Sequence, residues 1–106
     1  MSDFQPAIPL ADLKEGEVKA AIVNNTRVAL YLVDGQPYCT EDICTHEECF
    51  ISDGGFVEGE EVECSCHGAR FNVKTGDVTM LPAMDPLRTY PVQVQGDQVY
   101  VDASNK

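Results

Sequence analysis

Apolar, β-branched runs separated by two-residue turns dominate the first forty residues. Residues 18–23 and 26–33 are two such runs, and the pair Asn24-Asn25 between them tolerates the positive φ of a tight hairpin. Asp34-Gly35, the strongest short-range hairpin signal in the chain, then leads into residues 36–40. The pattern predicts three consecutive antiparallel strands.

The run 26–33 is apolar on both of its faces. One face carries Val28, Leu30 and Leu32, and the other carries Ala29, Tyr31 and Val33. A strand with one face in water would alternate apolar and polar residues, whereas a two-sided apolar strand is typical of a buried position. We therefore expect this strand to be central in its sheet.

The C-terminal part predicts a second hairpin. Residues 89–95 and 98–102 alternate apolar and polar side chains around the turn Gly96-Asp97. Only residues 10–15 indicate helix, for about one turn. Short strands with turns every 8 to 12 residues are typical of an all-β sandwich or barrel.

Residues 43–86 differ from both ends of the chain in being rich in glycine and proline. The breakers are Gly54, Gly55, Gly59, Gly68, Gly76, Pro82 and Pro86. We interpret this stretch as a loop-built subdomain that carries a site on a rigid β base. The 106 residues then form one domain, with the base at 1–42 and 87–106 and the subdomain at 43–86.

Composition excludes several classes of partner and points to a site. Lys and Arg number 7 against 18 Asp and Glu, so the net charge of -11 argues against nucleic acid and against an anionic membrane surface. The start lacks the features of a secretory signal and no window reaches the length of a membrane span, so we expect a cytoplasmic protein. Five cysteines in that compartment indicate a metal or redox site.

All five cysteines and both histidines lie in one acidic stretch. Residues 28–69 contain no Lys or Arg but ten carboxylates. Within it, Cys44-Thr45-His46 and Cys64-Ser65-Cys66-His67 each offer one thiol and one imidazole, and 17 residues separate His46 from Cys64. A structural zinc site would more often take paired cysteines from one segment, but zinc stays an alternative, as does an accidental grouping. A cluster of two irons can sort such ligands by type.

The motif C-x-H, 17 residues, C-x-x-H resembles that of Rieske proteins, and most of all the small soluble ferredoxins of bacterial aromatic-ring dioxygenase systems. The resemblance runs from about Phe4 to Asp102, and the segment Leu81-Pro82-Ala83 is similar to the third loop that covers the cluster. It implies a Rieske-type β base with a small cluster-binding subdomain formed by loops, and one [2Fe–2S] cluster. By resemblance Cys44 and Cys64 bind one iron, and His46 and His67 bind the other through Nδ1.

The resemblance also bears on the remaining cysteines. In cytochrome bc-type Rieske proteins the positions of Cys49 and Cys66 form a disulfide between the two cluster loops, and many dioxygenase ferredoxins lack the pair. We predict a Cys49–Cys66 bond worth about 3 kcal/mol, with two free thiols as the alternative. Cys39 has no such counterpart, and we expect it to be a small buried apolar residue.

Two further positions bear on the reduction potential. High-potential Rieske proteins carry a serine two residues after the second ligand histidine and a tyrosine four residues after it, and this chain has Ala69 and Phe71 there. Neither side chain can donate a hydrogen bond to sulfur, and the nearby carboxylates also disfavour an added electron. We expect a potential near the low end of the Rieske range, on the order of -150 mV.

The expected function is electron transfer and not catalysis. Both histidines are assigned to the cluster, so none is left for a mononuclear iron site, and the chain is too short for an oxygenase catalytic domain. The resemblance implies a monomeric one-electron carrier that passes electrons from a flavin-dependent ferredoxin reductase to a terminal oxygenase. The alternatives are a small subunit of an assimilatory nitrite reductase and a non-redox zinc module.

Docking to these partners is expected to be transient and electrostatically steered. The carboxylates expected to steer it are Glu41, Asp42, Glu47, Glu48 and Asp53. His46 and His67 are expected at an exposed tip, where their outer nitrogens would shorten the electron path into a docked partner.

Overall fold

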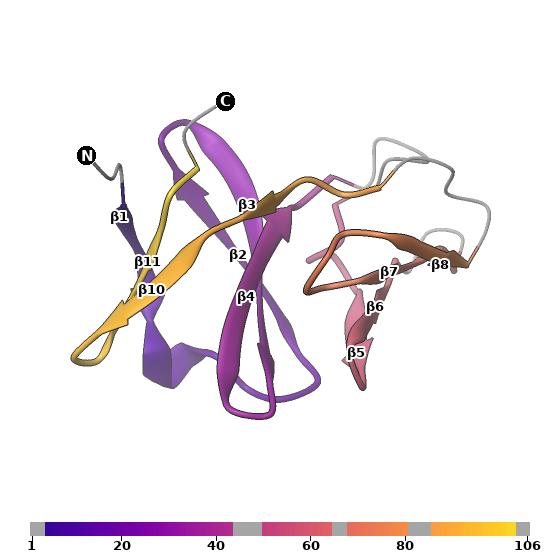
Figure 1. Ribbon diagram of the computed structural model, residues 1–106, viewed down its shortest axis with the longest axis horizontal. Helices are drawn as coiled ribbons and strands as arrows, with labels where there is room; N and C mark the ends of the chain where they lie inside the picture. The colour runs from indigo at the N-terminus through magenta and orange to yellow at the C-terminus, as the bar shows by residue number, and fades with distance from the viewer. Residues whose placement is uncertain (1–3, 44–49, 65–67, 81–85, 104–106) are drawn as a thin grey trace.

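The computed structural model describes residues 4–43, 50–64, 68–80 and 86–103, which form three antiparallel sheets (Figure 1). The outer sheet has the order β1-β11-β10, the central sheet β2-β3-β4-β9 and the distal sheet β5-β6-β7-β8. The elements are β1 (Gln5–Pro9), η1 (Leu10–Asp12), β2 (Val18–Val23), β3 (Thr26–Val33), β4 (Gln36–Glu41), β5 (Phe56–Glu58), β6 (Glu61–Glu63), β7 (Arg70–Asn72), β8 (Val78–Met80), β9 (Thr89–Tyr90), β10 (Val92–Gln95) and β11 (Gln98–Val101). The predicted all-β class is confirmed.

The two predicted turns of the central sheet are present at the expected residues. Asn24 and Asn25 have φ values of 52° and 60°, and Asp34 and Gly35 have values of 52° and 78°. Positive φ at both central residues matches the twist of the flanking strands, which is why these pairs join β2 to β3 and β3 to β4. The third strand is one residue longer than predicted, since β4 ends at Glu41.

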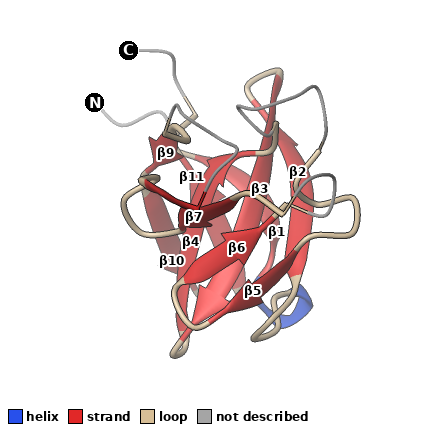
Figure 2. Ribbon diagram, turned by 90° about the vertical axis from the view of Figure 1, so that its right-hand side faces the viewer, coloured by secondary structure: helices blue, strands red, loops and turns tan. Residues whose placement is uncertain are grey.

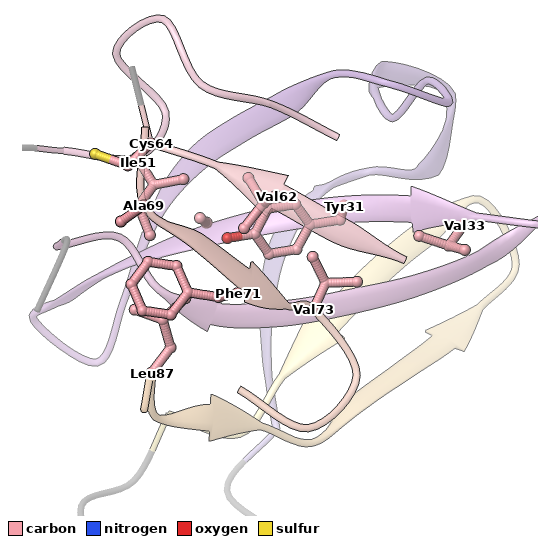
Figure 3. Close-up of a cluster of buried hydrophobic side chains, with 10 residues drawn as sticks. Tyr31, Val33, Ile51, Val62, Cys64, Ala69, Phe71, Val73 and Leu87 are labelled. Carbon is pink, nitrogen blue, oxygen red and sulfur yellow. The ribbon is translucent and has the colours of Figure 1, made fainter. Parts of the chain in front are cut away.

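Strand β3 is central, as its two apolar faces predicted. It pairs with β2 on one side and β4 on the other, and each face enters a different hydrophobic core. The core between the central and distal sheets contains Ala29, Tyr31, Val33, Ile51, Val62, Cys64, Ala69, Phe71, Val73 and Leu87 (Figure 3). The core between the outer and central sheets contains Leu13, Val23, Val28, Leu30, Cys39, Val99, Val101 and Ala103.

The buried state predicted for Cys39 is also confirmed. The residue is 2% exposed and belongs to the second core. Burial raises the pKa of its thiol well above the ordinary value, so this sulfur stays protonated and apolar at neutral pH.

Two features of the base differ from the sequence prediction. The run 89–95 is two strands, because Pro91 has no N–H for a ladder and the chain passes there from the central sheet (β9) to the outer sheet (β10). Strand β1 was not predicted, and its prolines Pro6 and Pro9 are tolerated because β1 is an edge strand with a register shift between Pro6 and Ile8. The predicted single helical turn is the 3-10 helix η1.

The distal sheet lies beside the central sheet and away from the outer sheet (Figure 1; Figure 2 gives the view from the distal side). Its strands span residues 56–80, inside the predicted subdomain, while the exact borders at 43 and 86 stay a prediction. In the described ranges, no helix is long and apolar enough to cross a membrane.

Candidate metal centre

Most of the predicted ligands lie outside the residues that the structure describes. This holds for Cys44, His46 and His67, for the predicted disulfide partners Cys49 and Cys66, for Glu47 and Glu48, and for the segment 81–83. Their positions therefore stay predictions, including the exposed histidine tip. The structure does describe Cys64 and the residues on either side of both ligand segments, which we call the first neck (42–43 and 50–52) and the second neck (63–64 and 68–69).

The first neck is closed by backbone pairing. Ile43 and Phe50 form an antiparallel bridge on either side of residues 44–49. One residue further out, the N–H of Ile51 donates to the carbonyl oxygen of Asp42 at 2.7 Å. The two arms that bear Cys44 and His46 between them are thus fixed to each other.

The second neck is tighter and includes a predicted ligand. Cys64 directly follows β6, its N–H donates to the carbonyl of Ala69 at 2.8 Å, and its carbonyl accepts from the N–H of Gly68 at 2.9 Å. Gly68 has a φ of 76°, which a residue with a Cβ adopts only at a cost. Cys64 is fully buried, and its sulfur points away from the centre of the core (Figure 3).

The two necks lie against each other. Ile51 of the first neck and Cys64 and Ala69 of the second belong to the same core (Figure 3). Gly55 stands between them, because its N–H donates to the carbonyl of Ile51 at 2.9 Å and an added Cβ would lie 2.9 Å from the carbonyl oxygen of Glu63. The chain therefore enters both ligand segments at neighbouring points of one end of the molecule.

The buried core residues that pack with Cys64, which we call the wall behind Cys64, are mostly apolar. The largest polar side chain among them is Tyr31, and its hydroxyl proton is already engaged in a hydrogen bond. The hydroxyl of Tyr31 lies 2.8 Å from Oγ1 of Thr40, which itself donates to the carbonyl of Glu41, so the Tyr31 proton is used within this chain. Burial raises the pKa of Tyr31, and the phenol stays neutral. Ala69 and Phe71 are fully buried in the same wall.

The outer face of the distal sheet is acidic even around its arginine. The guanidinium of Arg70 contacts carboxylate oxygens of Glu58 at 2.9 Å, Glu63 at 2.9 Å and Glu61 at 3.4 Å. Hydrogen bonds, first to Glu58, raise the pKa of Arg70. One cation against three carboxylates leaves this group net negative, which agrees with the negative surroundings predicted for the site.

One predicted steering carboxylate is wrongly assigned. The side chain of Asp42 is 0% exposed and accepts from Nε of Arg27 at 2.7 Å, so it cannot present charge to a partner. Glu41 is half-buried and accepts from the N–H of Arg88, whereas Asp53 is exposed as expected. Arg27 and Ser52, the partners of Asp42, were not predicted, because no local motif marks contacts between residues 10 and 15 positions apart.

The described geometry fits the donor set of a metal centre. Cys64 is a buried thiol on a rigid neck, and the neighbouring neck leads directly into Cys44 and His46. The sequence of the two segments that these necks enclose adds Cys44, His46 and His67 to Cys64, and two cysteines with two histidines are the ligand types of a mixed Cys/His iron–sulfur group.

Comparison with known proteins independently indicates an iron–sulfur centre. The family model described as "Rieske [2Fe-2S] domain" matches residues 3–91. The chain is 41% identical over 98 residues to the ferredoxin component of the naphthalene 1,2-dioxygenase system of Pseudomonas aeruginosa, covering 92% of this chain and 93% of that relative.

Solved structures are similar over the whole length. The ferredoxin of carbazole 1,9a-dioxygenase from Nocardioides aromaticivorans IC177 is 31% identical with a TM-score of 0.90, covering 97% of this chain and 100% of that one. A chain in the complex of reduced oxygenase and oxidized ferredoxin in carbazole 1,9a-dioxygenase is 33% identical with a TM-score of 0.88, covering 100% of this chain and 98% of that one.

Proposed function

Because the chain belongs to the family of Rieske [2Fe-2S] domains, we propose that it carries single electrons to the terminal oxygenase of an aromatic-ring dioxygenase system. Its relatives are named as ferredoxin components of such systems, and a similar ferredoxin is found in complex with its oxygenase. The chain is an electron-transfer component and not the oxygenase itself. A Rieske centre, when bound, takes up and releases one electron.

The observation that carries this proposal is the pair of adjacent necks with Cys64 buried at one of them. We propose that Cys44 and Cys64 hold one iron and that His46 and His67 hold the other. Residues 43–86 then form the cluster-binding subdomain on a base of 1–42 and 87–106. The closeness of Ile51 to Cys64 also supports the proposed Cys49–Cys66 bond, since each cysteine is within two residues of a described neck residue.

The partners, the oligomeric state and the location that we propose follow from the role of an electron carrier. We propose a flavin-dependent ferredoxin reductase as the electron donor, a terminal oxygenase as the acceptor, a monomeric carrier and a cytoplasmic location. A carrier that meets two partners in turn needs transient contacts. A net charge of -11 suits this role, because charge complementarity raises the rate of association more than the affinity.

The test is metal analysis followed by reconstitution. The protein purified in air should contain two irons and two acid-labile sulfides per chain and absorb visible light, whereas a zinc module would be colourless. Mixed with a dioxygenase reductase and oxygenase, it should couple NADH oxidation to substrate hydroxylation. Iron-free protein would overturn the cofactor assignment, and coupling to a nitrite reductase alone would overturn the partner assignment.

The described wall behind Cys64 predicts a low reduction potential. Ala69 and Phe71 belong to the same buried core as this cysteine and have no hydroxyl, so potentiometry should give a value on the order of -150 mV. Adding donors with Ala69→Ser and Phe71→Tyr should raise it by about 40 mV for each new hydrogen bond of about 1 kcal/mol. A clearly positive wild-type potential, or no rise in the double variant, would contradict this.

Steering predicts that the rate of electron transfer to the oxygenase falls as salt is added. Raising ionic strength from roughly 20 to 200 mM shortens the screening length, and the second-order rate constant should fall by about threefold or more. Asp53→Asn should lower the low-salt rate, because this exposed carboxylate follows the first neck. Asp97→Asn is the matched control, since its turn lies at the far end of β10 and β11 (Figure 1). A rate independent of salt would contradict steering.

A further inference from the structure

We propose that Asp42 is a positioning residue that, with Arg27 and Ser52, clamps the first neck and thereby sets the geometry of the ligands Cys44 and His46. This inference rests on the proposed function, because it concerns the same centre. We call these three residues the neck clamp.

Asp42 joins both arms of the first neck through three acceptors. Its carbonyl oxygen accepts from the N–H of Ile51 at 2.7 Å, as described above, and its carboxylate binds Ser52 twice. The Ser52 N–H donates to Oδ1 at 2.8 Å, and the Ser52 hydroxyl donates to Oδ2 at 2.6 Å. If either arm of the first neck rotated, the hydrogen bonds to the buried Asp42 would break.

Arg27 ties both arms to the base. Nε of Arg27 donates to Oδ2 of Asp42 at 2.7 Å, and the Arg27 carbonyl accepts from the Asp42 N–H at 3.2 Å. On the other arm, the guanidinium carbon lies 3.8 Å from the centre of the Phe50 ring, and Nη2 lies 3.4 Å from the Ser52 hydroxyl. One residue of β3 therefore fixes the neck at the residues immediately outside the segment 44–49, which contains Cys44 and His46.

The energetics favour a geometric role over a purely stabilising one. The Asp42 side chain is 0% exposed and the Arg27 side chain is 40% exposed, so the cost of burying the carboxylate offsets much of what the partly solvated ion pair contributes to stability. What the pair adds is a fixed direction, because each donor binds a particular oxygen of Asp42.

The first test removes one neutral member of the clamp from the cluster-loaded protein. Ser52→Ala should shift the electron paramagnetic resonance g values of the reduced protein and increase the rate of iron loss to a chelator about tenfold, which corresponds to 1.4 kcal/mol. Ser52→Thr keeps the hydroxyl and should therefore retain the wild-type g values and the wild-type rate of iron loss. Thr75→Ala is the control, since it removes a hydroxyl from an exposed turn of the same subdomain.

The second test separates geometry from charge. The double variant Arg27→Met, Asp42→Asn keeps the net charge of the protein, so a change in its g values and iron retention reports lost positioning. If both variants keep wild-type g values and iron-loss rates, or if Thr75→Ala changes them equally, the clamp is overturned. Wild-type protein without iron and sulfide would instead overturn the proposed function.

Discussion

Cys64→Ser is expected to give a folded protein that has lost its visible colour and nearly all of its iron. A serine hydroxyl is not ionised at neutral pH and is a poor iron ligand, whereas the thiolate is the ligand that Rieske centres use. Changes to residues that only support a metal ligand already cost 10- to 100-fold in affinity, so loss of the ligand itself should cost at least about that much. Iron, acid-labile sulfide and visible absorption of the purified variant measure the effect.

Cys39→Ser is the matched control, because it places the same change at a second buried thiol. Cys39 is 2% exposed and Cys64 is 0% exposed, but Cys39 lies in the core between the outer and central sheets. This variant should keep full iron and lose about 1 to 2 kcal/mol of unfolding free energy from burying a hydroxyl. A Cys64→Ser protein that retains the wild-type iron content would remove Cys64 from the ligand set.

Short sequence patterns were enough to predict the two turns of the central sheet and its central strand, because these features depend on residues that are close in the sequence. Asn24-Asn25 and Asp34-Gly35 adopt positive φ because their side chains permit it, and the two-sided apolar pattern of β3 requires burial on both sides. The split at Pro91 was less visible, because the alternation of residues 89–95 continues through it. Which sheet each half joins is decided by partners, β4 and β11, that are distant in the sequence.

The candidate site shows the same division. The segments Cys44-Thr45-His46 and Cys64-Ser65-Cys66-His67 are local motifs that indicated a metal or redox site, and their resemblance to the Rieske motif implied the iron–sulfur cluster. The burial of Asp42 was not predictable in this way, since it stands in an acidic stretch and its partner Arg27 is 15 residues away on β3. The contact of the two necks likewise depends on Gly55, whose role appears only when Ile51 and Glu63 are brought together.

Gly55→Ala is expected to destabilise the protein by about 3 kcal/mol or more and to impair iron binding. The added methyl group would overlap the carbonyl oxygen of Ile51 and lie 2.9 Å from that of Glu63, and both obstacles are backbone atoms that cannot rotate away. Overpacking of this kind costs about 1 to 3 kcal/mol where side chains can adjust, and more where they cannot. Chemical unfolding measures the loss, and iron content measures whether the necks have separated.

Gly59→Ala makes this test specific, because the two glycines differ in the cause of strain. Gly59 has a φ of +64° and nothing within 4 Å of an added Cβ, so alanine there should cost about 1 to 2 kcal/mol through conformation alone and leave iron binding intact. Gly55 has no positive φ, so its cost arises from collision between the necks. If Gly55→Ala behaves like Gly59→Ala in both measurements, close contact of the two necks is not what positions the ligands. A selective loss of iron in Gly55→Ala would link the close approach of Gly55 to the Ile51 and Glu63 carbonyls to the centre itself.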